Sequence, residues 1–230
     1  MTSAFSSKTI PFLTEAGQQT NPQWLDARIE VYDKLVKRPF IDLAVGLKTE
    51  LQPLLPDYHF PTQGIGRIKK STNKIVNGLP AYKDWLSISA SVPSDSRFER
   101  NPHLFFGILP NIKPYMGVVV AGGLFMPSGP QLKKMRIAIA DDASAFHALF
   151  ADAEFKKRFK ANFSRDQVAA RAPRGYDASH PDVDWLMLKS FLVIKNLSTS
   201  QFASPTLLES VVEDFKQLAR LNRLIESVLD

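Results

Sequence analysis

The sequence contains no cysteine among its 230 residues. Disulfides, iron–sulfur clusters, zinc ribbons and thiol nucleophiles are therefore excluded. Long hydrophobic runs are also lacking, since the longest, residues 115–126, spans only 12 residues with three glycines and is too short to cross a bilayer. Residues 1–20 show no basic start followed by an apolar core, so no secretory signal is predicted. The expected compartment is the cytoplasm, and no membrane partner is expected.

The remaining composition is typical of a folded globular protein, with 44% hydrophobic and 23% charged residues. A chain of this length buries enough surface to fold without covalent crosslinks. Residues 1–20 are polar and rich in Ser and Thr, and we expect them to be loosely ordered. Residues 21–230 show no repeat and no linker composition, which predicts a single domain.

Helical periodicity appears at both ends of the chain. Apolar residues recur at helical spacing over residues 22–36, where Pro39 predicts a stop, and again over 39–52. Ser128 and Gln131 match a capping box, which predicts a middle helix from residue 128. A long apolar stripe from Leu208 to Val228, capped by Ser204-Pro205, predicts a C-terminal helix.

The centre of the chain has the period of strands. Leu86, Ile88 and Ala90 alternate with serines, which indicates a strand with one buried face. We predict an α+β fold, because helices and strands are segregated along the chain. Its central antiparallel or mixed sheet should have about five strands, packed by the N-terminal helix pair, the middle helix and the long C-terminal helix. The expected strands lie near 65–70, 85–92, 103–109, 115–122 and 190–195.

Positive charge is concentrated in one stretch of the chain. Residues 65–140 hold 11 basic and three acidic residues, whereas the flanking stretches are close to neutral. Such an excess attracts phosphate, nucleic acid or an acidic surface, although a solvated basic face without a ligand fits it equally well. The excess is centred on Arg67, Lys69, Lys70, Lys74 and Lys83.

Common catalytic motifs are missing. The sequence has no G-x-S-x-G elbow, no phosphate-binding loop of the G-x-x-x-x-G-K-[ST] type and no H-E-x-x-H helix. Its four histidines lie far apart, and none has a second ligand at metal-binding spacing. We expect no metal and no cofactor.

Three blocks of the sequence together resemble one family. They are residues 21–28 with Tyr32 and Pro39, residues 122–127 with the helix that follows, and residues 171–191. The third block, which runs Arg-Ala-Pro-Arg-Gly-Tyr-Asp and ends in His-Pro, is the most specific. The blocks are similar to the bacterial and fungal family catalogued as domain of unknown function 2461. The resemblance covers nearly the whole chain but implies no activity, because the family has none established.

The chain departs from the family in its arginine-rich segment, which reads roughly R-x-x-R-D-x-R-F before a Tyr-Lys pair. Arg67 and Tyr82-Lys83 keep the outer positions. Lys70 replaces the second arginine and keeps its charge, but it loses the planar fork that binds an oxyanion at two points. Activity that depends on this segment is therefore in doubt.

Family members gather basic residues on a strand, on the helix after Pro127 and on the loop 171–177, where Gly175 is expected to adopt a positive φ. We predict that these residues converge into a basic cleft, with Tyr82 and Tyr176 at its rim and Asp177 as the internal partner of the arginines. The candidate ligand-binding residues are Arg67, Lys70, Tyr82, Lys83, Arg136, Arg171, Arg174, Tyr176, Asp177, His180 and Lys189.

The first hypothesis is a non-catalytic protein that accepts a small phosphate or carboxylate ligand in this cleft. The second is an enzyme acting on a phosphate- or carboxylate-bearing substrate, with Asp177 or His180 as the acid or base. Nucleic-acid binding is a third and less favoured hypothesis, because few aromatic residues are interleaved with the charge. The sequence contains no indication of the oligomeric state.

Overall fold

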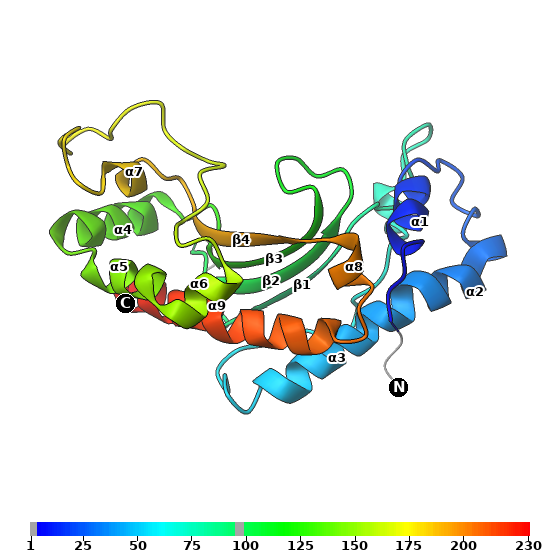
Figure 1. Cartoon of the computed structure of the whole chain (residues 1–230). Coiled ribbons are helices and arrows are strands. Elements are labelled where there is room, and N and C mark those ends of the chain that lie inside the picture. The colour runs from blue at the N-terminus through cyan, green and yellow to red at the C-terminus, as the bar shows by residue number, and fades with distance from the viewer. Residues whose placement is uncertain (1–3, 95–98) are drawn as a thin grey trace. The chain divides into compact units, whose positions relative to one another are not determined.

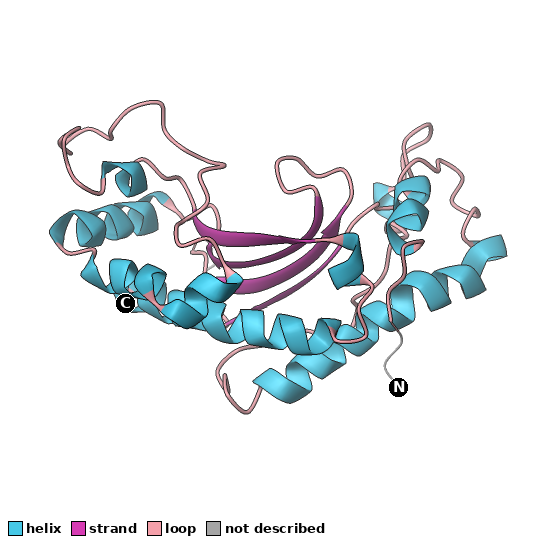
Figure 2. Ribbon diagram, viewed as in Figure 1, coloured by secondary structure: helices cyan, strands magenta, loops and turns pink. Residues whose placement is uncertain are grey.

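The α+β fold is confirmed in a computed structural model, which describes residues 4–94 and 99–230. Four strands form one antiparallel sheet in the order β1-β2-β3-β4 (Figures 1 and 2). Side chains alternate between buried and more exposed along β1, as the serine-containing pattern predicts. The strands are β1 (Leu86–Ser91), β2 (His103–Leu109), β3 (Gly117–Leu124) and β4 (Phe191–Leu197).

The prediction of a strand near residues 65–70 is wrong. This segment contributes only an isolated antiparallel bridge between Lys69 and Tyr82. Gly64 and Gly66 both have positive φ values, of 69° and 76°, so the chain turns repeatedly just before the bridge. Extended pairing needs a run of residues in the β region, and these turns prevent one.

Contacts group the chain into two compact units. The first contains residues 1–90, 105–120 and 196–212, and the second contains residues 91–104, 121–195 and 213–230. Each unit therefore includes parts of the sheet strands and part of the long C-terminal helix.

In the first unit, the N-terminal helices pack on the sheet. Helix α1 (Thr9–Ala16) lies within the segment that we expected to be loosely ordered, and its residues Leu13 and Ala16 are fully buried. The unit also contains α2 (Ile29–Tyr32), α3 (Arg38–Leu51) and α8 (Thr199–Phe202), together with the start of α9 (Leu207–Leu229).

Pro39 does not end a helix, contrary to the prediction. A π-helical turn, Asp33–Lys37, leads directly into α3, and Pro39 lies in the first turn of that helix. Proline has no N–H to donate to the carbonyl four residues earlier, which is that of Leu35. This carbonyl instead accepts a hydrogen bond from the buried Thr9 hydroxyl, at 2.8 Å. The contact joins α1 to the start of α3.

The second unit contains the middle helix and the short helices that follow it. The predicted capping box is confirmed, since Ser128 and Gln131 each accept a hydrogen bond from the other's backbone N–H. Gly122 in β3 lies directly against α9, because a Cβ added there would come within 2.7 Å of the Leu218 Cβ. The helices are α4 (Gly129–Asp141), α5 (Ser144–Ala151), α6 (Ala153–Arg158) and α7 (Val183–Leu186), followed by the remainder of α9.

A buried carboxylate joins three elements of the second unit. Asp214 on α9 has no exposed surface. Its Oδ1 accepts a hydrogen bond from Arg158 Nε on α6 at 2.6 Å, and its Oδ2 lies 2.8 Å from Lys195 Nζ on β4. The carboxylate therefore compensates two cations at once, which is what a charge this deeply buried requires.

Asn222, in the second half of α9, is buried, and no described residue forms a hydrogen bond with its side chain. Its side chain is fully inaccessible, and neither its Nδ2 nor its Oδ1 has a partner among the described residues. An unsatisfied buried polar group costs about 1–3 kcal/mol.

Replacing Asn222 by Leu, which has a similar volume and no polar atoms, is therefore expected to raise the free energy of unfolding by about 1–2 kcal/mol. Urea denaturation would measure the change. Asn222→Asp is the opposing control and should destabilise the protein, because it buries a charge. A loss of stability in Asn222→Leu would show that a bound molecule satisfies the amide.

No helix formed by residues 4–94 or 99–230 has both the length and the apolar character needed to cross a membrane.

Candidate functional site

The centre of the positive charge folds as a short hairpin, residues 67–83, which we call the basic hairpin. Its arms pair through Lys70 N to Ala81 O at 3.0 Å and Lys83 N to Ile68 O at 2.9 Å. Between the arms, a 3₁₀ turn (Thr72–Lys74) leads into a loop that ends at Pro80. The hairpin carries five basic residues and no acidic residue.

Tyr82 attaches this hairpin to the core and does not lie at the rim of a cleft, which corrects the prediction. Its side chain is 1% exposed, and its ring packs edge-on against Trp24. The hydroxyl accepts a hydrogen bond from Leu25 N at 3.1 Å and donates one to Pro22 O at 2.7 Å. Both hydrogen-bonding roles of the hydroxyl are therefore occupied by the backbone, and Tyr82 has a structural role.

Lys83 lies close to two further cations. Burial lowers the pKa of Lys83, and the neighbouring positive charges of Arg67 and Lys74 lower it further. Its Nζ lies 4.7 Å from the centre of the Trp85 ring, an attraction that favours the ammonium form. Within residues 4–94 and 99–230, no carboxylate forms an ion pair with any of these three cations. The cluster of Arg67, Lys74 and Lys83 thus has uncompensated charge.

The other basic residues of the hairpin contribute less to this cluster. Lys70 Nζ donates across the hairpin to Pro80 O at 2.7 Å, so it holds the two arms together. Arg67 is exposed, and its Nε donates to Lys69 O at 3.2 Å. The two terminal nitrogens of the Arg67 guanidinium remain available for a ligand.

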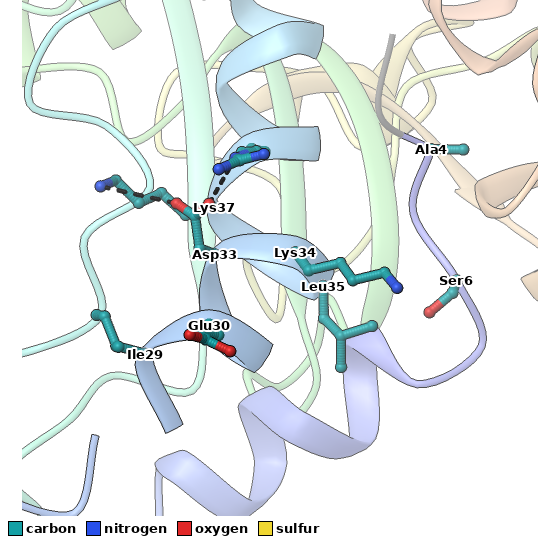
Figure 3. A pocket seen from close by; sticks show the side chains of 9 residues that line it. Ala4, Ser6, Ile29, Glu30, Asp33, Lys34, Leu35 and Lys37 are labelled. Carbon is teal, nitrogen blue, oxygen red and sulfur yellow. Dashed lines mark ion pairs between the residues drawn. The ribbon is translucent and has the colours of Figure 1, made fainter. Parts of the chain in front are cut away.

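A cavity of about 830 Å³ lies in the same unit, between the N-terminal segment and the helical residues 29–38 (Figure 3). Sequence reasoning missed it, because its walls come from two separate segments. Asp33 pairs with Lys37 and with Arg38, the latter at 2.5 Å, whereas Lys34 extends toward Ser6 on the other wall. The lining residues are Ala4, Ser6, Ile29, Glu30, Asp33, Lys34, Leu35, Lys37 and Arg38.

Tyr32 connects this cavity wall with the basic hairpin. Its hydroxyl donates to Gly66 O, one residue before Arg67. Burial raises the pKa of Tyr32 to about 12, while the charge of Asp33 raises it and that of Arg67 lowers it. The charges of Asp33 and Arg67 therefore act on the same phenol with opposite effects.

The loop with the strongest family resemblance belongs to the second unit. Gly175 has a φ of 92°, which confirms the expected positive value. Asp177 forms no ion pair with an arginine of residues 4–94 or 99–230. Its Oδ1 accepts the Ser179 N–H at 2.8 Å, a contact that lowers its pKa. Arg171 and Arg174 are exposed, and neither forms an ion pair with a described residue. Their side chains remain available for a ligand.

Arg136 makes structural contacts in the same unit. Its Nε donates to Leu186 O at 2.9 Å, and one terminal nitrogen lies 3.4 Å from Leu188 O. Burial lowers the pKa of Arg136, and the proximity of Tyr176 raises it. Arg136 therefore ties α4 to the end of α7, with Tyr176 close by, while Lys189 is exposed.

Both ring nitrogens of His180 form hydrogen bonds within the fold. Its Nδ1 accepts the Asp182 N–H at 3.0 Å, and its Nε2 lies 3.3 Å from Ala140 O. An accepting Nδ1 assigns the proton to Nε2, which then donates to that carbonyl. Acid–base chemistry at His180 would require one of these contacts to break.

A pair that sequence reasoning missed lies beside it. His147 Nε2 and Asp182 Oδ1 are 2.6 Å apart, and the imidazole stacks on Trp185 with centroids at 4.4 Å. The two residues lie 35 positions apart on different helical segments, so no local spacing predicts their contact. They fasten α5 to the N-terminal end of α7.

No group of three or more His, Asp or Glu side chains among the described residues is placed to hold a metal ion. The candidate residues divide between the units: Arg67, Lys70, Tyr82 and Lys83 belong to the first, and the remaining seven belong to the second. Convergence of the two sets into one cleft stays a prediction.

Comparison with known families agrees with the sequence blocks. The profile of the family described as "Conserved hypothetical protein (DUF2461)" matches residues 8–223. The chain therefore belongs to this family, as its resemblance predicts. Searches of curated proteins and of solved structures found no match.

Proposed function

We propose that this member of the DUF2461 family is a non-catalytic protein that binds a small phosphate- or carboxylate-bearing ligand through Arg67, Lys74 and Lys83. One observation carries the proposal: Arg67 and Lys74 both lie close enough to Lys83 to lower its pKa, and no described carboxylate pairs with any of the three cations. Like charges held together destabilise one another, so the arrangement is favourable only when an anion is present.

The chemistry of the three groups suits an oxyanion. The Arg67 guanidinium offers two nitrogens in a plane, and charge-assisted hydrogen bonds of this kind are the strongest that side chains make. Lys74 and Lys83 add two further positive charges. Lys83 is half-buried beside Trp85, so an anion bound there is partly shielded from water. An anion at this position raises the pKa of Lys83 and reverses the effect of its neighbours.

A wider ligand site remains part of the proposal. Arg171 and Arg174 are exposed on a loop, with free guanidinium groups, and Lys189 is exposed nearby in the sequence. These residues suit a second phosphate or carboxylate.

Replacing Lys83 by Met is expected to abolish anion binding while making the free protein more stable. A lysine whose folded pKa is lowered costs stability in its charged form at neutral pH, and that cost fades as the pH rises through the folded pKa. Removing the charge therefore raises Tm at pH 7. Phosphate at 100 times its Kd should stabilise the wild type by about 2.7 kcal/mol and Lys83→Met by much less. Thermal unfolding with increasing inorganic phosphate would measure both effects.

Lys133→Met is the matched control, because Lys133 is an exposed lysine on α4 that forms no ion pair with a described residue. It should keep the full response to phosphate and show little change in Tm. An equal response to phosphate in wild type and Lys83→Met, checked by titration calorimetry, would contradict the proposal.

A further inference from the structure

The tip of the basic hairpin exposes two aliphatic side chains to solvent. Val76 and Leu79 are 54% and 56% exposed. They occupy the first and last positions of a tight turn, which is closed by a hydrogen bond from Leu79 N to Val76 O at 3.0 Å. The two side chains are therefore at the two ends of the same four-residue turn. Single exposed aliphatic residues are ordinary on a protein surface, whereas these two adjoin each other and form an apolar patch at the end of the hairpin.

The turn itself projects into open space. Gly78, at its third position, has a φ of 79°, and a Cβ added there would meet no atom within 4 Å. The arms behind the turn are held firmly, through Ala81 N to Gln19 O at 2.7 Å and through the buried Tyr82. The hairpin thus presents a protruding apolar tip on a fixed base.

Positive charge surrounds this tip. Lys74 ends the 3₁₀ turn two residues before Val76, and Arg67, Lys69, Lys70 and Lys83 lie on the arms, with no acidic residue from 67 to 83. An apolar element bordered by Lys and Arg is what binds the interface of a bilayer that contains anionic lipids. Binding to nucleic acid would instead call for aromatic side chains that stack on bases, and the residues at this tip are aliphatic.

We infer that the basic hairpin is a peripheral membrane-binding element, in which Val76 and Leu79 enter the interfacial layer and the surrounding cations bind anionic lipid headgroups. The inference rests on the proposed anion site, since it identifies the headgroup phosphate or carboxylate as the anion at Arg67, Lys74 and Lys83. It is compatible with the lack of a membrane-crossing helix within the described part of the chain, because peripheral adsorption needs none.

Co-sedimentation of the full chain with vesicles would test this inference. We expect binding to vesicles of phosphatidylcholine mixed with phosphatidylserine, little binding to phosphatidylcholine alone, and a decrease with ionic strength. The double variant Val76→Ser, Leu79→Ser should bind at least about tenfold more weakly, because it removes the apolar contact and leaves the charge of the hairpin unchanged. Lys74→Gln should weaken binding about fivefold. Val45→Ser, at an aliphatic residue on α3 that is 46% exposed, is the control and should bind like the wild type.

The outcomes separate this inference from the proposed function. Equal vesicle binding by the wild type and the double variant would overturn the inference, and so would a lack of binding to the anionic vesicles. Binding of a single-stranded oligonucleotide that is tighter than vesicle binding, and that the double variant retains, would replace the membrane with nucleic acid. Inorganic phosphate should still stabilise the double variant. If phosphate binds but vesicles do not, the anion site stands and its ligand is a free anion; if phosphate fails to bind the wild type, the proposed function itself fails.

Discussion

Asp214→Ala is expected to lower the free energy of unfolding by about 3–5 kcal/mol. The substitution removes a carboxylate with no exposed surface and leaves Arg158 and Lys195 without their partner, although their side chains are only 27% and 20% exposed. Two neighbouring cations in such an environment repel each other and have lost the hydrogen bonds that compensated their burial. Urea denaturation followed by circular dichroism would measure the loss, with an unchanged m-value as evidence that the folded states are comparable.

Glu213→Ala provides the control at the adjacent position. Glu213 forms an exposed ion pair with Lys216 on the same helix, and such pairs contribute about 0.3–0.5 kcal/mol. We therefore expect Asp214→Ala to lower the free energy of unfolding several times more than Glu213→Ala does. A cost below about 1 kcal/mol for Asp214→Ala would show that the two cations reach solvent easily, and the buried network would have no stabilising role.

Gly123→Ala should destabilise the protein at least as much as Asp214→Ala does. Gly123 lies in β3 with a φ of 119°, a conformation that costs side-chain-bearing residues about 1–3 kcal/mol. In addition, a Cβ at this position would lie 2.0 Å from the carbonyl oxygen of Phe191 in β4, which is backbone and cannot turn aside. We expect a loss of more than about 3 kcal/mol, or failure to fold, because the neighbouring strand must move away. Thermal unfolding and the yield of soluble protein would report it.

Gly129→Ala is the matched control for this substitution. Gly129 begins α4, and a Cβ there would meet nothing within 4 Å. Alanine restricts the unfolded chain, but its Cβ is disfavoured in a helical residue that precedes Pro130, so we expect a net change of less than about 1 kcal/mol. A Gly123→Ala variant as stable as Gly129→Ala would mean that β3 and β4 do not approach as closely as the structure has them.

The sheet and the long helices could be predicted from the sequence because their patterns are local. Alternation of Leu86, Ile88 and Ala90 with serines reports one buried face directly. The strand expected near 65–70 failed because Gly64 and Gly66 turn the chain there. The bridge that does form joins Lys69 to Tyr82, whose position is set by the distant Leu25 and Pro22. Tertiary contacts of this kind override local preference.

Helix α1 escaped prediction for a similar reason. The Ser- and Thr-rich start reads as loosely ordered, but Thr9 is fully buried and bonds to a carbonyl 26 residues away. No pattern within residues 1–20 reveals that acceptor.

The positive charge of the candidate site could be predicted from the sequence, but the positions of its side chains could not. The excess of basic residues around Arg67 and Lys83 could be counted, and the structure places those two side chains close together. Tyr82 was misjudged because an aromatic residue beside a lysine suits a ligand rim and a hydrophobic core equally well. The contact between His147 and Asp182 arises only when two helical segments meet, so no spacing along the chain could reveal it.

The attachment of Thr9 to the Leu35 carbonyl also orders events during synthesis. Thr9 leaves the ribosome well before Leu35 and Pro39, so α1 exists as a short segment before its acceptor has been made. The carbonyl is positioned for Thr9 only after the π-helical turn and the first turn of α3 have formed. An eight-residue helix is marginal on its own in water. Helix α1 is therefore translated before the other helices of the structure, but it forms its contact with the Leu35 carbonyl only later.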